Sequence, residues 1–185
     1  MREATPIEFQ KIKKYFKKTF SINISDEINK YSIFVFSSRI YLLDKQNKMF
    51  ERFLTKTSRL TTFLLSFGLY FGDLAPDGSI KPTLEGFCIF AKLIKKSYLV
   101  LNDAGEQMFL YGKSILYEGV DHFKPPIKKY KLIYIFNKNH ECLGIAKSVV
   151  NDDFLGKNKE LHALVARPLY DRGLYIRSSG FLFKL

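Results

Sequence analysis

The residue types that most often perform catalysis are few in this chain, and they lack the spacing that their chemistry needs. Asp152 and Asp153 are adjacent carboxylates, but general acid–base catalysis needs two carboxylates that face one substrate, and neighbours in a turn point apart. The two cysteines and three histidines stand neither at zinc-ligand spacing nor in a nucleophile signature. The sequence also lacks a glycine-rich phosphate loop and a G-x-S-x-G motif. We therefore predict that the protein is not an enzyme, and we expect no catalytic residue, metal or cofactor.

The strongest chemical signal is an excess of positive charge. The chain of 185 residues has 30 lysines and arginines against 18 acidic residues, which leaves a formal charge of +12 at pH 7. The excess is spread over both halves of the chain, so it belongs to folded surface and not to one basic tail. Such a balance favours a polyanionic partner, with nucleic acid first and an anionic membrane surface second.

The apolar content predicts a folded protein with a real core. Apolar residues make up 46% of the chain. The most apolar stretch, residues 60–74, is interrupted by Thr, Ser and Gly, and it is too short and polar to cross a bilayer. Residues 1–6 lack the apolar segment of a secretory signal. We therefore expect an intracellular, reduced protein that is not embedded in a membrane.

The first predicted element is a lysine-rich helix over residues 6–20. Thr5 is a good N-cap, Pro6 suits the first helical turn, and Glu8 completes a capping box. The residues expected on the inner face are Ile7, Ile12, Tyr15, Phe16 and Phe20. The residues expected on the outer face are Lys11, Lys13, Lys14, Lys17 and Lys18. This outer face is either a solvated helix surface or a surface that contacts phosphates.

The remaining pattern predicts a mixed first half and a second half of short strands. In the first half we expect a hairpin over 31–43, a helix over 44–54 and a strand over 60–71. A turn with a short strand over 76–82 and a helix over 84–94 follow. In the second half we expect a helix over 104–111, ended by a glycine, and strands over 97–101, 114–117, 130–136, 143–147, 161–167 and 174–177. Short strands separated by frequent turns are typical of a small barrel.

The most specific pattern lies between residues 103 and 120. A short helix ends at a glycine and is followed by an apolar strand and a second glycine. This order resembles the opening of a PUA domain, an RNA-binding pseudo-barrel named for pseudouridine synthase and archaeosine transglycosylase. Residues 143–147, 163–167 and 171–177 are similar to the later strands of that domain.

The segment GEQMFLYG, residues 105–112, is similar to the one that marks the Nip-seven family of ribosome-biogenesis factors. Residues 39–41, 66–68 and 71–72 fall where that family has similar residues in its N-terminal domain. The resemblance implies an α+β protein, with an N-terminal mixed antiparallel-sheet and helix domain packed on a C-terminal PUA pseudo-β-barrel. It divides the chain into a pre-PUA domain (1–95), a PUA domain (96–177) and a C-terminal extension (178–185) that departs from the family pattern.

The resemblance also implies where RNA binds. A PUA domain is expected to hold RNA against its glycine loop, helix and closing strand, where cations neutralise phosphates and aromatic rings stack on unpaired bases. The cations that correspond to this surface are Lys113, Lys147, Lys157, Lys159, Arg167, Arg172 and Arg177. The candidate stacking residues, which could instead be core or rim residues, are Tyr111 and Tyr175.

The resemblance implies a non-catalytic, RNA-binding factor in large ribosomal subunit biogenesis and pre-rRNA processing. Its RNA would be single-stranded and U-preferring, and ribosome-assembly proteins or an exosome would be its protein partners. The alternative is an adaptor that presents RNA to a processing or modifying enzyme such as the exosome. In either case we expect a monomer that is cytoplasmic, or nucleolar and nuclear if the source cell has a nucleus. The lysine-faced helix would contact protein or the rRNA backbone.

Overall fold

The computed structural model describes residues 2–46, 68–157 and 160–179, which form two compact units, Met1–Phe90 and Ala91–Leu185. Each unit combines one sheet with helices, so the predicted α+β class is confirmed. The expected helix over 44–54 and the expected strand over 60–71 both lie mostly outside the described residues. The domain boundary at residue 95 stays a prediction.

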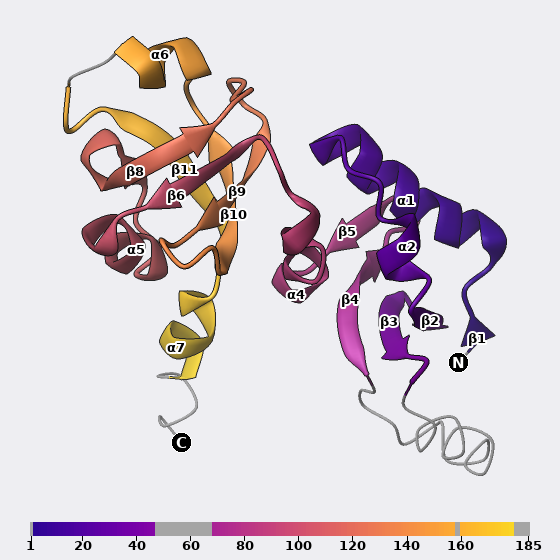
Figure 1. The fold of residues 1–185 in the computed structure, drawn as a ribbon. Helices are drawn as coiled ribbons and strands as arrows, with labels where there is room; N and C mark the ends of the chain where they lie inside the picture. Colours follow the sequence, from indigo (N-terminus) through magenta and orange to yellow (C-terminus); the bar gives the residue numbers. More distant parts are fainter. Residues whose placement is uncertain (1, 47–67, 158–159, 180–185) are drawn as a thin grey trace. The chain divides into compact units, whose positions relative to one another are not determined.

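The first unit is a five-stranded antiparallel sheet with helices, in the strand order β1-β2-β3-β4-β5 (Figure 1). Its elements are β1 (Arg2–Glu3), α1 (Pro6–Phe20), α2 (Ser25–Ile28), β2 (Tyr31–Phe36), β3 (Arg39–Asp44), β4 (Leu69–Leu74), β5 (Ile80–Pro82) and α4 (Leu84–Cys88). The predicted hairpin is confirmed, because β2 and β3 pair in register from Tyr31 opposite Asp44 to Phe36 opposite Arg39.

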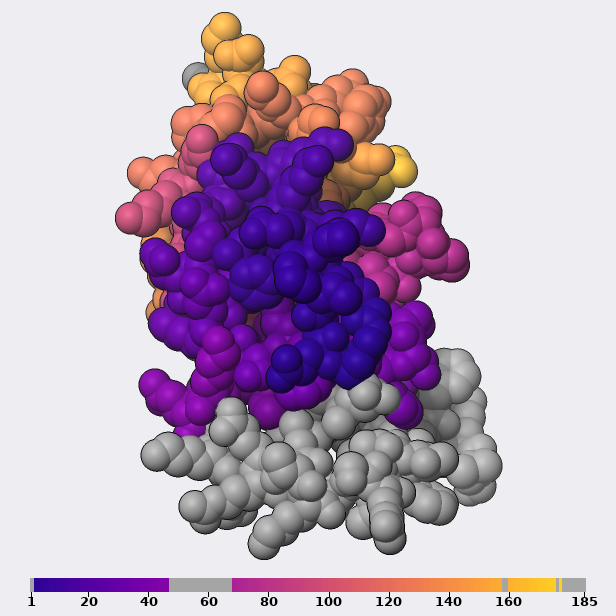
Figure 2. All heavy atoms as spheres, turned by 90° about the vertical axis from the view of Figure 1, so that its right-hand side faces the viewer, coloured from indigo at the N-terminus to yellow at the C-terminus, as the bar shows by residue number. Residues whose placement is uncertain are grey.

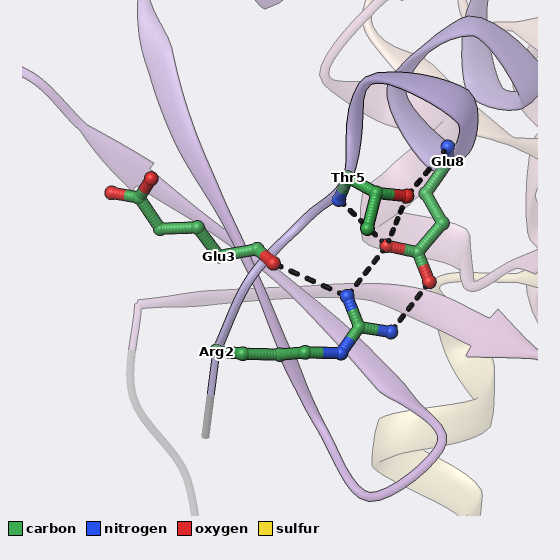
Figure 3. A network of polar contacts seen from close by, with 4 residues as sticks. All are labelled: Arg2, Glu3, Thr5 and Glu8. Atoms are coloured by element: carbon green, nitrogen blue, oxygen red, sulfur yellow. Dashed lines mark hydrogen bonds and ion pairs between the residues drawn. The ribbon is translucent and has the colours of Figure 1, made fainter.

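The predicted capping box starts α1, and an arginine joins it (Figure 3). The Glu8 backbone amide donates to Thr5 Oγ1 at 3.3 Å, and the Thr5 amide donates to Glu8 Oε2 at 2.8 Å. Arg2, from β1, donates to both carboxylate oxygens of Glu8 at 2.7 Å each. This network ties the first strand to the first helix and satisfies amides that a helix end otherwise leaves unpaired.

The inner face of α1 is built around Phe16, which is fully buried. Its ring lies 4.8 Å from that of Phe90 and 6.2 Å from that of Phe71 on β4, measured between centroids. Ile12 and Phe20 are buried as predicted, but Ile7 is 70% exposed, so its predicted inward position is wrong. In Figure 2 the indigo atoms of the N-terminal segment and α1 stand at the front of this unit, open to solvent.

The last helix of the first unit is shorter than predicted. It ends at Cys88 instead of near residue 94, and a separate 3₁₀ turn follows at Ala91–Leu93. The Phe90 amide donates to the Phe87 carbonyl, which tightens the chain at this point. The tight turn allows Phe90 to reach the ring of Phe16, so core packing ends the helix early.

The Glu8 network predicts a pH-dependent stability. The hydrogen bonds from Arg2, followed in effect by those from Thr5, lower the pKa of Glu8 from its ordinary 4.5 to about 2. A lowered folded-state pKa gives stability that is full above about pH 4.5 and is lost as the pH falls through about 2. Glu8→Gln should therefore be less stable than wild type by about 1 kcal/mol at pH 7, allowing for the exposure of Arg2.

Urea unfolding at pH 7, 4.5 and 2.5 checks this expectation, with the difference between the two proteins shrinking at the lowest pH. Glu3→Gln is the matched control, because Glu3 is exposed and its carboxylate points away from the network in Figure 3. A constant difference between Glu8→Gln and wild type across this pH range would contradict the assignment.

The second unit is a six-stranded sheet in the order β7-β11-β10-β9-β6-β8 (Figure 1). Its elements are η2 (Ala91–Leu93), β6 (Tyr98–Leu101), α5 (Asp103–Leu110), β7 (Ile115–Leu116), η3 (Tyr117–Gly119), β8 (Val120–Lys124), β9 (Leu132–Phe136), β10 (Cys142–Ser148), α6 (Asp152–Lys157), β11 (Leu164–Asp171) and α7 (Gly173–Ser179). Strands β6 and β9 run parallel, while the other described pairs of this sheet are antiparallel.

A short link between the two outermost strands requires this sheet to curl. Strands β7 and β8 lie at opposite edges, yet only the turn Tyr117–Gly119 separates them in sequence. Six strands laid flat would put their edges about 24 Å apart, whereas the link can span about 14 Å at most. The sheet therefore bends around its core into a half-barrel. That core includes Leu99, Phe109, Ile133, Ile135 and Val165.

The second unit differs from the prediction in three places. Asp152 and Asp153 were predicted to lie in a turn, but they begin the helix α6. Residues 174–177 were expected to form a strand, but they belong to the helix α7. Leu174 and Tyr175 are both about half exposed, so the alternating burial of a strand is absent there. The sequence prediction also missed β8, in which Asp121, His122 and Lys124 are exposed. An edge strand with polar side chains has little hydrophobic pattern by which to recognise it.

The glycines of the 103–120 pattern allow α5 to lie directly on the turn that follows β7. A Cβ atom on Gly105 would meet the carbonyl oxygen and the Cα atom of Gly119. Asn102 caps α5 at the Gly105 amide (2.9 Å) and donates from its side chain to the Glu118 carbonyl (2.7 Å). The close approach of two backbones therefore explains why glycine stands at both positions.

Gly105→Ala should lower the free energy of unfolding by about 1–3 kcal/mol, because the added methyl group forces two backbones apart. Gly156→Ala is the control: this glycine is in α6 and has nothing within 4 Å of the Cβ position, so its replacement should be neutral or slightly stabilising. Thermal or urea unfolding of both variants measures the difference. Equal stabilities would contradict the role of Gly105.

Candidate nucleic-acid interface

The C-terminal end of α5 is closed by a Schellman motif that places Lys113. Gly112 has a φ of 75°, which glycine adopts without strain. The Lys113 amide donates to the Met108 carbonyl at 3.0 Å, and the Gly112 amide donates to the Phe109 carbonyl at 2.8 Å. Because its backbone is bonded in this way, Lys113 leaves the helix at a defined point with its side chain exposed.

Arg177 fastens α7 to this end of α5. Its guanidinium donates to both carboxylate oxygens of Asp171, at 2.9 and 3.0 Å, and also to the Leu110 carbonyl. The Asp171 residue is only 5% exposed, and its hydrogen bonds raise the pKa of Arg177 above its ordinary value. A planar guanidinium suits such a bidentate pair. Arg177 was predicted to bind RNA, but in the structure its guanidinium is engaged within the protein.

The end of the unit formed by α5 and α7, here called the α5–α7 end, also presents tyrosines and cations. Tyr111 is 61% exposed and Tyr175 is 53% exposed. Lys113 and Arg172 are exposed as well, and the Arg172 backbone amide is held by the Leu143 carbonyl at 3.0 Å. Exposed rings beside fixed cations can stack on unpaired bases and neutralise phosphates.

The other predicted cations lie elsewhere on the second unit. Lys147 and Arg167 are direct register partners on β10 and β11, and both are exposed. Lys157 ends α6, which stands at the opposite end of the unit from α7 in Figure 1. Lys159 lies outside the described residues. The structure therefore divides the single predicted site into separate groups.

One exposed aromatic residue was missed by the sequence prediction. Tyr130 is 61% exposed, and the ammonium groups of Lys129 and Lys147 lie 5.1 and 5.8 Å from its ring centroid. The run Lys-Lys-Tyr-Lys at residues 128–131, in which an aromatic residue interrupts consecutive lysines, was the signal available in the sequence. The sequence pattern places Tyr130 at the start of a strand, but in the structure that strand, β9, begins at Leu132.

The residues that form the curled sheet, α5 and α7 match a known family. Residues 97–180 match the family model described as the UPF0113 PUA domain. The second half of this chain is a PUA domain. The α5–α7 end is thus the part of this PUA domain that contains its first helix and its glycine loop.

Whole-chain comparisons extend the likeness to both units. The chain is 24% identical over 182 residues to "60S ribosome subunit biogenesis protein NIP7" of Saccharomyces cerevisiae, a match that covers 98% of this chain and 96% of the relative. The predicted resemblance to the Nip-seven family is confirmed.

Solved structures share the fold. A conserved PUA domain protein from Thermoplasma acidophilum has a TM-score of 0.60 at 11% identity, covering 96% of this chain and 97% of that one. A PUA domain from Aeropyrum pernix K1, solved as a tartrate complex, has a TM-score of 0.58 at 12% identity, covering 92% and 84%.

Among the described residues, no three His, Cys, Asp or Glu side chains gather as a metal site would require. In the same part of the chain, no helix is long and apolar enough to cross a membrane.

The PUA domain's Arg177 is expected to position α7 and not to contact RNA itself. Arg177→Ala should speed amide hydrogen exchange across α7, because Asp171 loses the partner that holds the helix. Asp171→Asn keeps the cation but weakens the same pair, so it should speed exchange too. Arg172→Ala, which removes an adjacent exposed cation, is the control and should leave exchange unchanged.

Measurements of RNA affinity distinguish a positioning role of Arg177 from direct contact with RNA. If Arg177 acts only by positioning α7 and neutralising Asp171, both variants should weaken RNA binding. Arg177→Ala should weaken it more, because it leaves the Asp171 carboxylate uncompensated. A loss of binding in Arg177→Ala alone, with α7 exchange unchanged, would instead make Arg177 a direct RNA contact.

Proposed function

We propose that this protein is a non-catalytic RNA-binding factor in large ribosomal subunit biogenesis and pre-rRNA processing. It binds single-stranded, U-preferring RNA through its PUA domain. The observation that carries the proposal is the α5–α7 end of a PUA domain, where Tyr111 and Lys113 after α5 and Arg172 and Tyr175 at the start of α7 are exposed. The whole-chain similarity to a protein named for 60S subunit biogenesis supports the biological setting.

The chemistry of this surface suits a single strand better than a duplex. Unpaired bases expose the flat faces on which Tyr111 and Tyr175 can stack, and a duplex hides those faces. Lys113 and Arg172 supply positive charge for phosphates and carry no base preference of their own. Preference for U therefore has to come from how closely a small pyrimidine fits beside the rings, and it should be mild.

The net charge of +12 supports a polyanionic partner. Part of that charge lies on the outer face of α1, where Lys11, Lys14, Lys17 and Lys18 are exposed. In this proposal the first unit contacts assembly proteins or the rRNA backbone, while the PUA domain selects single-stranded RNA. The protein acts where ribosomes are assembled, in the cytoplasm or, in a nucleated cell, the nucleolus.

Fluorescence anisotropy with labelled oligo-U, oligo-A and duplex RNA tests the proposal. Wild type should bind oligo-U most tightly, with a log–log salt slope of about −0.7 for each phosphate neutralised. Lys113→Ala/Arg172→Ala should bind about 10- to 30-fold more weakly at 0.1 M salt and lose about 1.4 from the slope. Lys14→Ala/Lys17→Ala removes the same charge from the first unit and is the matched control.

The control variant also distinguishes the alternatives. If it loses binding and the PUA variant does not, the RNA site belongs to the first unit. If wild type binds RNA only together with a nuclease or modifying enzyme, the adaptor role replaces the proposed one. Absence of binding under all conditions would refute direct RNA recognition.

A further inference from the structure

A second aromatic surface of the PUA domain lies outside the α5–α7 end. Its centre is Tyr130, whose ring is 61% exposed even though tyrosine is a large and partly apolar side chain. The ammonium groups of two lysines lie over the ring, with Lys129 Nζ at 5.1 Å and Lys147 Nζ at 5.8 Å from the centroid. These distances are within the range of attraction between a cation and an aromatic ring.

The backbone under this ring is held in place. The Tyr130 amide donates to the Ser148 carbonyl at 2.7 Å, and the Lys129 amide donates to Asn151 Oδ1 at 2.9 Å. The Ser148 amide in turn donates to the Lys131 carbonyl at 3.0 Å. Tyr130 itself has a φ of 65°, a conformation that a bulky residue adopts only where its surroundings impose it. The fold thus fixes the point at which the ring leaves the surface.

The surroundings of the ring are strongly basic. Lys128 and Lys131 flank the turn and are exposed. Arg167, the register partner of Lys147 on the neighbouring strand, is exposed on the same pair of strands. The sequence therefore gathers five cations and one tyrosine from three segments that are far apart along the chain, a grouping produced by the β10–β11 pairing and the turn before β9.

We propose that Tyr130, Lys129, Lys147 and Arg167, here called the Tyr130 platform, form a second contact for single-stranded RNA. A base stacks on the Tyr130 ring, and the lysines and Arg167 hold the phosphates on either side of it. This inference rests on the proposed function, because it assumes that the PUA domain binds RNA, and it adds a site that the α5–α7 end does not include.

A nucleotide suits this geometry better than an acidic peptide does. It joins a flat π face to a phosphate. A base that stacks on Tyr130 displaces a lysine ammonium group from over the ring, and the displaced ammonium group is then available to the phosphate. An acidic peptide would use the lysines alone and would leave the exposed ring without a function.

The Tyr130 platform and the α5–α7 end lie at different positions along the β10–β11 strand pair. Asp171, which anchors α7, lies opposite Gly144, whereas Arg167 lies opposite Lys147. Three residues of β10 separate these positions, or about 10 Å at the rise of a strand. An RNA of several nucleotides that binds the α5–α7 end can therefore continue to the Tyr130 platform.

Tyr130→Ala tests the platform with fluorescein-labelled oligo-U of about twelve nucleotides as the probe. Loss of one stacked base should weaken binding about 5- to 100-fold. Tyr130→Phe keeps the ring and should stay within about twofold of wild type. Lys129→Ala/Lys147→Ala should lower the salt slope by about 1.4. RNA containing 4-thiouridine should crosslink to the peptide that contains Tyr130, and melting temperatures confirm that each variant is folded.

The outcomes separate the platform from the proposed function. If Tyr130→Ala binds like wild type while Lys113→Ala/Arg172→Ala loses affinity, the platform is refuted and the proposed function stands. If the lysine variant weakens binding but Tyr130→Ala does not, the surface attracts phosphates without stacking, which also refutes the platform. If wild type binds no RNA, both are refuted, and binding of a poly-glutamate peptide would then assign the surface to an acidic protein partner.

Discussion

The geometry of the PUA domain depends on one covalent constraint, the short turn of residues 117–119 between the two edge strands of its sheet. Because so few residues cannot cross a flat sheet, the strands must curl, and curling encloses the core around Phe109 and Val165. The same turn must lie against α5, which is possible because Gly105 and Gly119 let the two backbones meet. The position of α5, and with it the surface that Lys113 and Tyr111 occupy, follows from this closure.

The sequence predicts features that local chemistry decides. The capping box of Thr5 and Glu8 and the glycine end of α5 at Gly112 need only their neighbours, so their predicted positions are close to the observed ones. Prediction fails where tertiary contacts decide. Strand β8 is an edge strand with polar side chains, and α7 is helical although its consecutive Leu, Tyr and Ile residues resemble a short strand. Helix α4 ends early, and the ring of Phe90 packs against that of Phe16 in the core.

The candidate site likewise combines features that the local sequence decides with features that tertiary contacts decide. The sequence identified basic and aromatic residues in a PUA-like region, but it could not predict which of them lie together on the surface. Strand register sets Lys147 beside Arg167, a turn brings Tyr130 next to Lys147, and an ion pair with Asp171 engages the exposed Arg177. The first two placements depend on a partner distant in sequence, and the third depends on the tertiary position of α7. A search for aromatic residues inside lysine runs would have found Tyr130, because that signal needs no knowledge of the fold.

The pairing of Arg177 with Asp171 also neutralises a negative charge at the α5–α7 end. Asp171 is a carboxylate under the surface where phosphates are to approach, and it would repel them if its charge were left uncompensated. Arg177 lies directly against it and cancels that charge through a bidentate contact. Helix α7 therefore supplies, through Arg177, the positive charge that neutralises Asp171. Its docking makes Lys113 and Arg172 the dominant charges that an approaching RNA strand meets.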